Sequence, residues 1–165
     1  MNADVLLETL VWGLAGTISL SIIMGAAQGL HYTRINLPII LGTMVAGNLD
    51  HAIRAGYLMH FVMGWLQAYA YLVLFWATGE ATWYIGGAFG VVHALFVLTV
   101  ILPIIPSIHP RMSTEHRQPL PTSLLEPPGF LGLHYGGGTP FVTVVAHLCY
   151  GAILGAGIPV TELSG

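Results

Sequence analysis

The stretch TWYIGGAFGVVHALFVLTVILPII, residues 82–105, decides the class of this protein. It contains no Asp, Glu, Lys or Arg along its whole length. The hydrocarbon layer of a bilayer is ~30 Å thick and a helix rises ~1.5 Å per residue, so about 20 apolar residues suffice to cross it. We therefore predict a membrane-spanning helix here.

The rest of the chain has the same character. Of its 165 residues, 55% are hydrophobic and only 7% are charged, with a mean hydropathy of +0.78, whereas a soluble domain carries about a quarter charged residues. Three more segments qualify as spans, at about residues 5–28, 55–78 and 141–160. The sequence thus predicts an all-α membrane protein, with residues 1–165 forming a single domain of four transmembrane helices in a compact bundle.

The basic residues indicate the orientation. The chain has no lysine, and its four arginines lie in the first and third connections, at Arg34, Arg54, Arg111 and Arg117. Because cytoplasmic loops retain Lys and Arg, we place these two connections in the cytoplasm and both termini outside. Asp4 and Glu8, with no basic residue nearby, argue against a cleaved signal peptide, so the first helix is expected to be kept.

The two cytoplasmic connections differ in kind. The first contains LPIILGTMVAG (37–47), an apolar segment too short to span, which we expect to lie in the interface, with Pro38 preventing a continuous helix. The third is far longer than the ~2–8 residues typical between bundle helices, and its Pro-Pro-Gly and Gly-Gly-Gly turns alternate with apolar residues. It is expected to fold back over the cytoplasmic end and to bring together His109, His116, His134, Glu115 and Glu126, with Glu126 paired to Arg111 or Arg117.

Each span carries a stripe of polar or small residues three and four positions apart, the spacing of one helical face. Polar groups that face lipid lose several kcal/mol when unsatisfied, so the stripes should turn toward one another and form a polar seam. The pairs Gly25/Gly29, Gly86/Gly90 and Gly151/Gly155 have the spacing that lets helix backbones approach closely. The seam residues outside the histidines are Gln28, Gln67, Tyr71 and Thr143.

The histidines of the spans admit two interpretations. His60, His93 and His147, with His109 just outside the membrane, are candidates to bind a transition metal, a haem or a chlorophyll-type pigment through neutral imidazole nitrogens. We expect His60 and His147 at similar depth, with His109 as a third metal ligand, and His93 nearer the middle of the membrane. Alternatively, the same side chains are neutral and form hydrogen bonds between helices.

Other classes of function lack support in the sequence. No Asp or Glu lies in the middle of a span, which argues against a carboxylate-bridged di-metal centre. The single cysteine, Cys149, cannot form an intramolecular disulfide, and no hydrolase or phosphate-binding motif occurs. Four scattered basic residues give no basis for nucleic-acid binding. A small transporter or channel remains an alternative, although four spans without inverted repeats are a poor match to that class.

Several strings resemble a group of small bacterial four-span membrane proteins of uncharacterised function. They are RINLPIILGTM, IHPRM, LEPPGF and YGGGTP, with a histidine early in the second span and HLCYGAILG in the last. The resemblance covers most of the chain and implies a location in the bacterial inner membrane. It implies no activity and no site residue.

The leading hypothesis is a non-catalytic accessory or scaffold subunit, in contact with membrane lipid and either with other membrane protein subunits or with further copies of itself. The chain has almost no charge, tightly packing helices and one long structured loop suited to docking. The alternative is a histidine-ligated metal, haem or pigment protein, an oxidoreductase or electron carrier.

Overall fold

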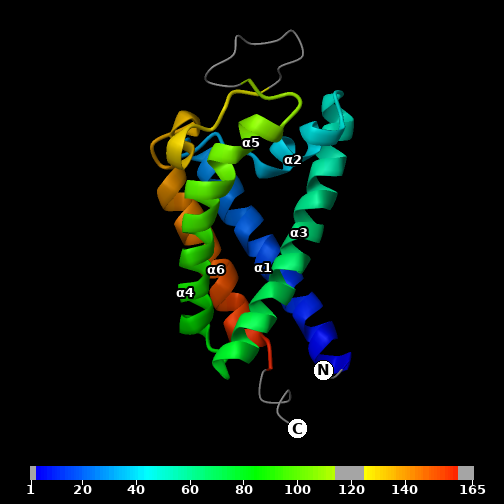
Figure 1. Ribbon diagram of the computed structural model, residues 1–165, viewed down its shortest axis with the longest axis vertical. Coiled ribbons are helices and arrows are strands. Elements are labelled where there is room, and N and C mark those ends of the chain that lie inside the picture. Colours follow the sequence, from blue (N-terminus) through cyan, green and yellow to red (C-terminus); the bar gives the residue numbers. More distant parts are fainter. Residues whose placement is uncertain (1–2, 114–124, 160–165) are drawn as a thin grey trace. The chain divides into compact units, whose positions relative to one another are not determined.

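The computed structural model describes residues 3–113 and 125–159, and within them four helices are long and apolar enough to cross a membrane. The first three are Ala3–Gly29 (α1), Leu49–Thr78 (α3) and Trp83–Ile108, and the fourth is Thr139–Gly157 (α6) (Figure 1). The described part contains no strand. The predictions of an all-helical, multi-pass membrane protein and of four spans are confirmed.

The second long helix begins at Leu49, earlier than the predicted residue 55. Asn48 precedes it, and its side-chain oxygen accepts the backbone N–H groups of Asp50 and His51 at 2.9 and 3.3 Å. This is the hydrogen bonding of a helix N-cap, and the Asp50 carboxylate lies favourably near the positive end of the helix dipole. The hydropathy of the sequence locates the membrane-spanning part of a helix, whereas the polar first turns depend on the cap.

The third long helix continues past the predicted residue 105 because one of its turns is widened. It consists of Trp83–Phe96 (α4), a π-helical turn Val97–Ile101 (η1) and Leu102–Ile108 (α5). The N–H of Leu102 bonds to the carbonyl of Val97, five residues back. Pro103 has no N–H, and its ring crowds the carbonyl four residues earlier. The wide turn provides the space for that ring, so the helix passes through Pro103 and Pro106 to Ile108.

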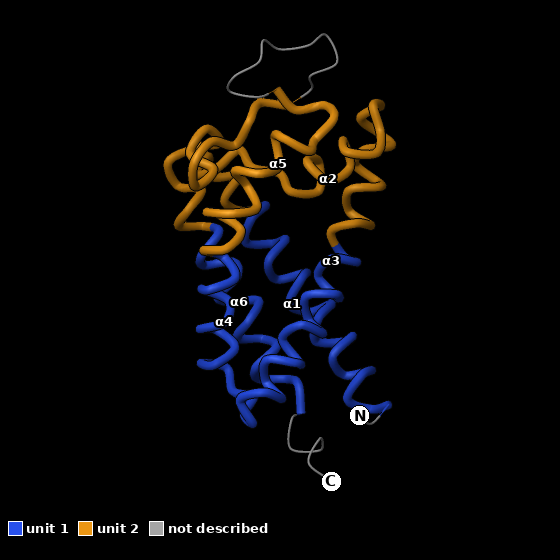
Figure 2. The backbone as a smooth tube through the Cα atoms, viewed as in Figure 1, with its two compact units in different colours: residues 1–25, 61–94, 143–165 blue, residues 26–60, 95–142 orange. Residues whose placement is uncertain are grey.

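The chain divides into two compact units, which are described separately (Figure 2). Unit 1 comprises residues 1–25, 61–94 and 143–165, and unit 2 comprises residues 26–60 and 95–142. The long helices contribute to both units. The prediction that the chain forms a single compact bundle stays a prediction.

In unit 1, α4 and α6 are in backbone contact through their glycines. A Cβ atom on Gly86 would overlap the carbonyl oxygen of Gly151, and one on Gly151 would overlap that of Gly86. Gly90 likewise faces the carbonyl of His147, and Gly155 faces that of Thr82. Two of the three predicted glycine pairs therefore pack against each other.

The other helices of unit 1 close around a core of aliphatic and aromatic residues. The α1 helix approaches α3 where Gly13 faces Ala68 and where Gly64 faces the side chain of Thr17. Tyr150 of α6 covers Gly16 of α1. The buried core consists of Val5, Ala68, Tyr71, Leu72, Phe75, Tyr150, Leu154 and Ile158.

In unit 2, the apolar segment after α1 forms a separate short helix, Leu37–Val45 (α2). Asn36 caps its N-terminus by accepting the N–H of Ile39 at 3.0 Å, and Pro38 lies in the first turn, where it needs no N–H partner. A Cβ on Gly42 would overlap the carbonyl of Ala52, and one on Gly56 would overlap that of Pro38. The first turns of α3 therefore hold α2 by direct backbone contact. The break between α1 and α2 lies at residues 30–36, ahead of Pro38.

The third connection of unit 2 is ordered in its described parts. Residues 111–113 pair with Leu125, whose N–H bonds to Arg111 O and whose carbonyl accepts the N–H of Ser113. A 3-10 turn, Phe130–Tyr135 (η2), then leads into α6. Glu115, His116 and Arg117 lie outside the described residues.

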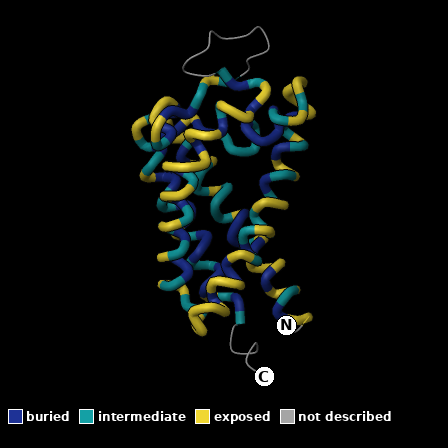
Figure 3. Tube along the Cα trace, viewed as in Figure 1, coloured by how far each residue is buried: buried dark blue, intermediate teal, exposed yellow. Residues whose placement is uncertain are grey.

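Exposed residues recur along the long helices (Figure 3). On α1 they include Leu7, Val11, Ile18 and Ile22, all apolar. Apolar side chains on the outside and polar ones within are what a bilayer requires, because lipid cannot hydrogen-bond a polar group.

Candidate functional site

The polar seam of unit 1 brings together Gln67 of α3, His93 of α4 and His147 of α6. The rings of His93 and His147 lie edge to face, with centroids 4.7 Å apart and planes at 84°. Gln67 Nε2 lies 3.2 Å from His93 Nε2, and the Tyr71 hydroxyl lies 3.4 Å from His93 Nδ1. We expected His93 to lie nearer the middle of the membrane than His147, whereas the two rings lie directly beside each other. Three helices are joined here by neutral polar contacts.

The hydrogen bonds assign a tautomer to each ring. The Gln67 amide donates to His93 Nε2, so the proton of His93 lies on Nδ1 and faces the Tyr71 oxygen. His147 Nδ1 donates to the backbone carbonyl of Thr143 at 2.8 Å, which leaves Nε2 as its unprotonated nitrogen. His93 thus has both nitrogens engaged by a neighbouring helix, whereas His147 has one engaged by its own helix.

Thr143 takes part in the seam through its backbone. Its carbonyl accepts the Nδ1 proton of His147 one turn further along the same helix, whereas the seam was expected to bond between helices. The side chain is 4% exposed, and its Oγ1 has no hydrogen-bond partner in the described part of the chain. The Nε1 of Trp65 is likewise buried without a hydrogen-bond partner among the described residues.

A tyrosine pair continues the seam on its aromatic side. The ring of Tyr71 packs edge to face against Tyr150, with centroids 5.6 Å apart. Tyr150 donates its hydroxyl to the carbonyl of Gly64 at 2.7 Å, so it joins α6 to α3. Phe75 and Phe89 pack beside Tyr71. The spacing of polar residues in the sequence indicates Tyr71 and Tyr150, but not that they meet, and it does not indicate Phe75 or Phe89.

Gln28 and His109 belong to unit 2, where each supports the first connection. Gln28 Nε2 donates to the carbonyl of Ile35 at 2.8 Å. His109 is 4% exposed, its Nδ1 accepts the N–H of Arg111 at 3.1 Å, and its Nε2 lies 2.9 Å from the carbonyl of Ile40. Its Nε2 is also 3.2 Å from the hydroxyl of Thr43. Both nitrogens of His109 are occupied, so it could bind a metal only by giving up one of these bonds.

Arg111 completes this arrangement at the end of α2. Its Nη1 donates to the carbonyl of Thr43 at 2.9 Å and lies 3.4 Å from that of Met44. These carbonyls belong to the last turn of α2, where a cation is favoured by the helix dipole and by carbonyls that lack helical partners. His109 and Arg111 together therefore fix α2 to the start of the third connection.

A metal site built from three ligands is not seen in the described residues. Within residues 3–113 and 125–159, no three His, Cys, Asp or Glu side chains lie close enough to share an ion. His60 is buried and makes an interaction of its own. It belongs to unit 2, whereas His93 and His147 belong to unit 1. The joint metal site of His60, His147 and His109 stays a prediction.

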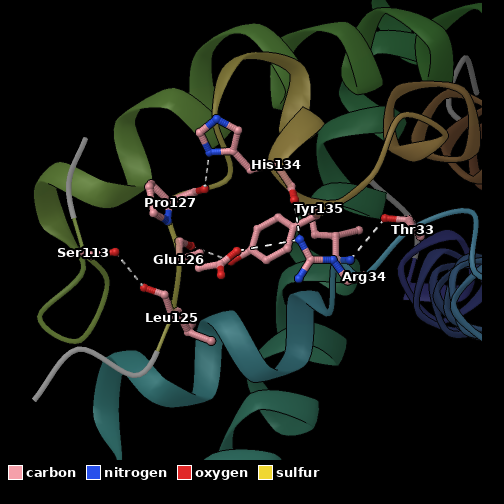
Figure 4. A network of polar contacts seen from close by, with 9 residues as sticks. Thr33, Arg34, Ser113, Leu125, Glu126, Pro127, His134 and Tyr135 are labelled. Carbon is pink, nitrogen blue, oxygen red and sulfur yellow. Dashed lines mark hydrogen bonds and ion pairs between the residues drawn. The ribbon is translucent and has the colours of Figure 1, made fainter. Parts of the chain in front are cut away.

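A third polar network joins the first and third connections (Figure 4). The backbone N–H of Arg34 donates to Tyr135 O, and its Nη2 donates to His134 O, both at 2.6 Å. Tyr135 donates its hydroxyl to the carbonyl of Glu126 at 2.7 Å, and His134 Nδ1 bonds to the carbonyl of Pro127 at 3.0 Å. The buried hydroxyls of Thr33 and Thr139 meet at 2.7 Å beside this network.

Among the described residues, the charged partner of Glu126 is Arg34 and not Arg111. The Glu126 carboxylate lies 3.7 Å from Arg34 Nη2, whereas Arg111 is occupied at α2 and Arg117 is outside the described residues. Arg34 is distant in sequence, and only the fold brings it near. Burial raises the pKa of Tyr135 to about 12, with a further increase from the charge of Glu126 and a decrease from Arg34.

No protein-family model, curated protein or solved structure matches this chain. Its function therefore has to be inferred from the contacts described above.

Proposed function

We propose that this protein is a non-catalytic accessory or scaffold subunit of a larger membrane protein assembly. The observation that carries the proposal is an open glycine pair on α1. A Cβ on Gly25 or Gly29 would meet no atom of the described chain within 4 Å, and both residues are exposed. In membranes, helices associate largely through such close-packing small residues. We infer that the helix of another subunit, or of a second copy of this chain, lies against this pair.

The use of the histidines supports a structural role. His93 and His109 each have both ring nitrogens in contacts that hold helices or connections together. A general acid or base needs a nitrogen that can reach a substrate. These two side chains therefore fit structural ties better than catalysis. We place the protein in the bacterial inner membrane, with both Arg-containing connections in the cytoplasm.

The proposal is tested by extraction from native membranes in a mild detergent, followed by native mass spectrometry. We expect co-purifying subunits or a homo-oligomer with the wild type, and a free monomer with Gly25→Ile/Gly29→Ile. Ala70→Ile adds bulk at another exposed position, on α3, and should leave the assembly intact. A monomeric wild type without partners would overturn the proposal, and a double variant that keeps its partners would remove Gly25 and Gly29 from the interface.

One observation favours a second candidate, a histidine-ligated cofactor protein. His147 donates Nδ1–H to a backbone carbonyl and keeps an unprotonated Nε2, which is how metal-ligating histidines are commonly oriented. A transition metal, a haem or a chlorophyll-type pigment would bind at this nitrogen. An optical spectrum and elemental analysis of the gently purified protein decide the matter. A stoichiometric cofactor that is lost in His147→Ala would support this candidate, and a colourless, metal-free protein would reject it.

A further inference from the structure

The η2 turn in unit 2 lies beside a membrane-spanning helix rather than beyond its end. A methyl group on Gly132 would lie 3.1 Å from Leu102 Cδ1, and η2 packs against both α5 and η1. Leu102 precedes the last residue of its span, Ile108, by 108 − 102 = 6 residues, which is ~9 Å along the axis. The turn is therefore set back from the end of the helix.

The length of that helix places the turn at the edge of the hydrocarbon. The span Trp83–Ile108 has 26 residues, or ~39 Å, against a hydrocarbon thickness of ~30 Å. Even if the whole excess of ~9 Å extended beyond the bilayer at this end, Leu102 would still lie at the boundary. If part of the excess length extends beyond the opposite face of the bilayer instead, or if the helix is tilted, Leu102 lies deeper in the hydrocarbon. A turn packed against Leu102 thus lies at the level of the lipid glycerol groups or below.

Lipid offers no hydrogen-bond donor, so a buried carbonyl at this depth needs one from the protein. Three carbonyls are bonded within the segment: Gly132 N–H donates to Gly129 O, His134 N–H to Pro128 O, and Gly136 N–H to Leu133 O. Two more are bonded by side chains of the segment, since Tyr135 Oη–H donates to Glu126 O and His134 Nδ1–H to Pro127 O. Neighbouring residues bond a further three, with Arg34 Nη2–H donating to His134 O, Arg34 N–H to Tyr135 O and Thr139 N–H to Gly136 O.

The turn exposes apolar side chains, and its backbone adopts an unfavourable conformation at Leu131. Phe130 is 66% exposed and Leu133 is 46% exposed. Between them, Leu131 adopts a positive φ of 55°, a conformation that is costly for a residue with a Cβ. Gly129 and Gly132 on either side also have positive φ. Such a conformation persists only where the surrounding contacts hold it and often marks a functional segment.

The charged residues of the network fit the headgroup layer. The side chains of Arg34 and Glu126 are both 67% exposed, and their 3.7 Å pair is weak enough to open. A phosphate can bind the guanidinium from outside. Long charged side chains near span ends commonly extend to the interface in this way.

We propose that residues 126–138 form an interfacial anchor that inserts Phe130 and Leu133 into the phospholipid layer of the membrane that the helices span. Arg34 and Glu126 lie at its outer edge, among the headgroups. The surface that binds here is lipid and not a protein subunit, because the turn packs against α5 at the depth of the hydrocarbon edge, and α5 itself exposes the apolar side chains of Ile104 and Ile108. The inference goes beyond the accessory role and holds whether or not a partner binds at Gly25 and Gly29.

Spin labelling of the full chain tests the anchor, since Cys149→Ser gives a cysteine-free background. In that background, Phe130→Cys and Leu133→Cys are labelled with a nitroxide and reconstituted into vesicles of phosphatidylethanolamine and phosphatidylglycerol. Collision rates with oxygen, which concentrates in lipid, and with a nickel chelate, which stays in water, report the depth of each label. Val92→Cys on the exposed face of α4 and Glu80→Cys in the turn between spans serve as references for lipid and water.

We expect both labels to show an oxygen-to-nickel collision ratio several-fold above that of the Glu80 label and at or below that of the Val92 label. Collision ratios equal to that of the Glu80 label would overturn the proposal, because the turn would then lie in water. Immobilised labels shielded from both reagents would also overturn it, because a second copy of the chain would cover the turn. Circular dichroism and thermal unfolding of each labelled variant, compared with the Cys149→Ser parent, verify the fold.

Discussion

The contact between α4 and α6 gives the sharpest prediction, for the variant Gly86→Ala. The new methyl group would overlap the carbonyl oxygen of Gly151 and would lie 2.9 Å from both Gly151 C and Gly155 N. Unstrained contacts between carbon atoms need ~3.5–4.0 Å, so the two backbones must separate by about an ångström or more. Overpacking of this kind costs ~1–3 kcal/mol, and the helical preference of Ala over Gly returns only ~0.5–1 kcal/mol of it.

The matched control is Gly87→Ala, one residue further along the same helix. Its new methyl group would lie 3.8 Å from Leu148 and 3.9 Å from Ala152, which is ordinary van der Waals contact, so only the gain in helical preference should remain. Unfolding in mild detergent by added dodecyl sulfate, followed by far-ultraviolet circular dichroism, compares the two variants. We expect Gly86→Ala to unfold at clearly lower dodecyl sulfate than the wild type, and Gly87→Ala to unfold at the same level or higher. Equal midpoints for the two variants would refute the backbone contact between α4 and α6.

Three further predictions concern the polar contacts. Tyr150→Phe removes one interhelical hydrogen bond and should lower the free energy of unfolding by ~0.5–1.5 kcal/mol in the same assay, whereas Tyr84→Phe, on an exposed side chain, should have no effect. His109→Ala leaves the N–H of Arg111 and the carbonyl of Ile40 without their partner, and should lower the free energy of unfolding by ~2–4 kcal/mol. An unchanged unfolding midpoint in dodecyl sulfate would show that α2 does not depend on this side chain. Tyr135 has a pKa of about 12 in the folded protein, against an ordinary tyrosine pKa of 10.0. The stability that comes from this difference should be complete below pH 10 and lost as the pH rises through 12. Unfolding curves measured at alkaline pH should show this loss in the wild type and not in Tyr135→Phe.

The polar seam shows how far spacing alone can predict a site. The positions of His93 and His147 indicated polar faces on α4 and α6, and the structure brings these two rings together. The identity of each bonding atom could not be predicted, because it depends on the rotation and height of one helix against another. Gln67 and Tyr71 of α3 illustrate this point, since each meets a different ring nitrogen of His93 on α4.

The long third connection was predictable in kind but not in its pairings. Its apolar and turn-forming residues indicated an ordered segment, and residues 125–138 are ordered in the structure. The predicted pairing of Glu126 relied on nearness along the chain to Arg111. The actual partner, Arg34, lies in the first connection, and it is brought there by backbone bonds to His134 and Tyr135.

The sequence by itself determined the class of this protein and the number of its spans, because the exclusion of charge from hydrocarbon acts on composition and length alone. It also indicated that LPIILGTMVAG is too short to span the membrane, and these residues form the short helix α2 with Pro38 in its first turn. Only the tertiary structure decided which glycine pairs are packed against another helix. Gly86/Gly90 and Gly151/Gly155 are, whereas Gly25 and Gly29 have no such neighbour among the described residues. All three pairs have the same spacing in the sequence, and only the positions of neighbouring backbones distinguish a buried contact from an exposed surface.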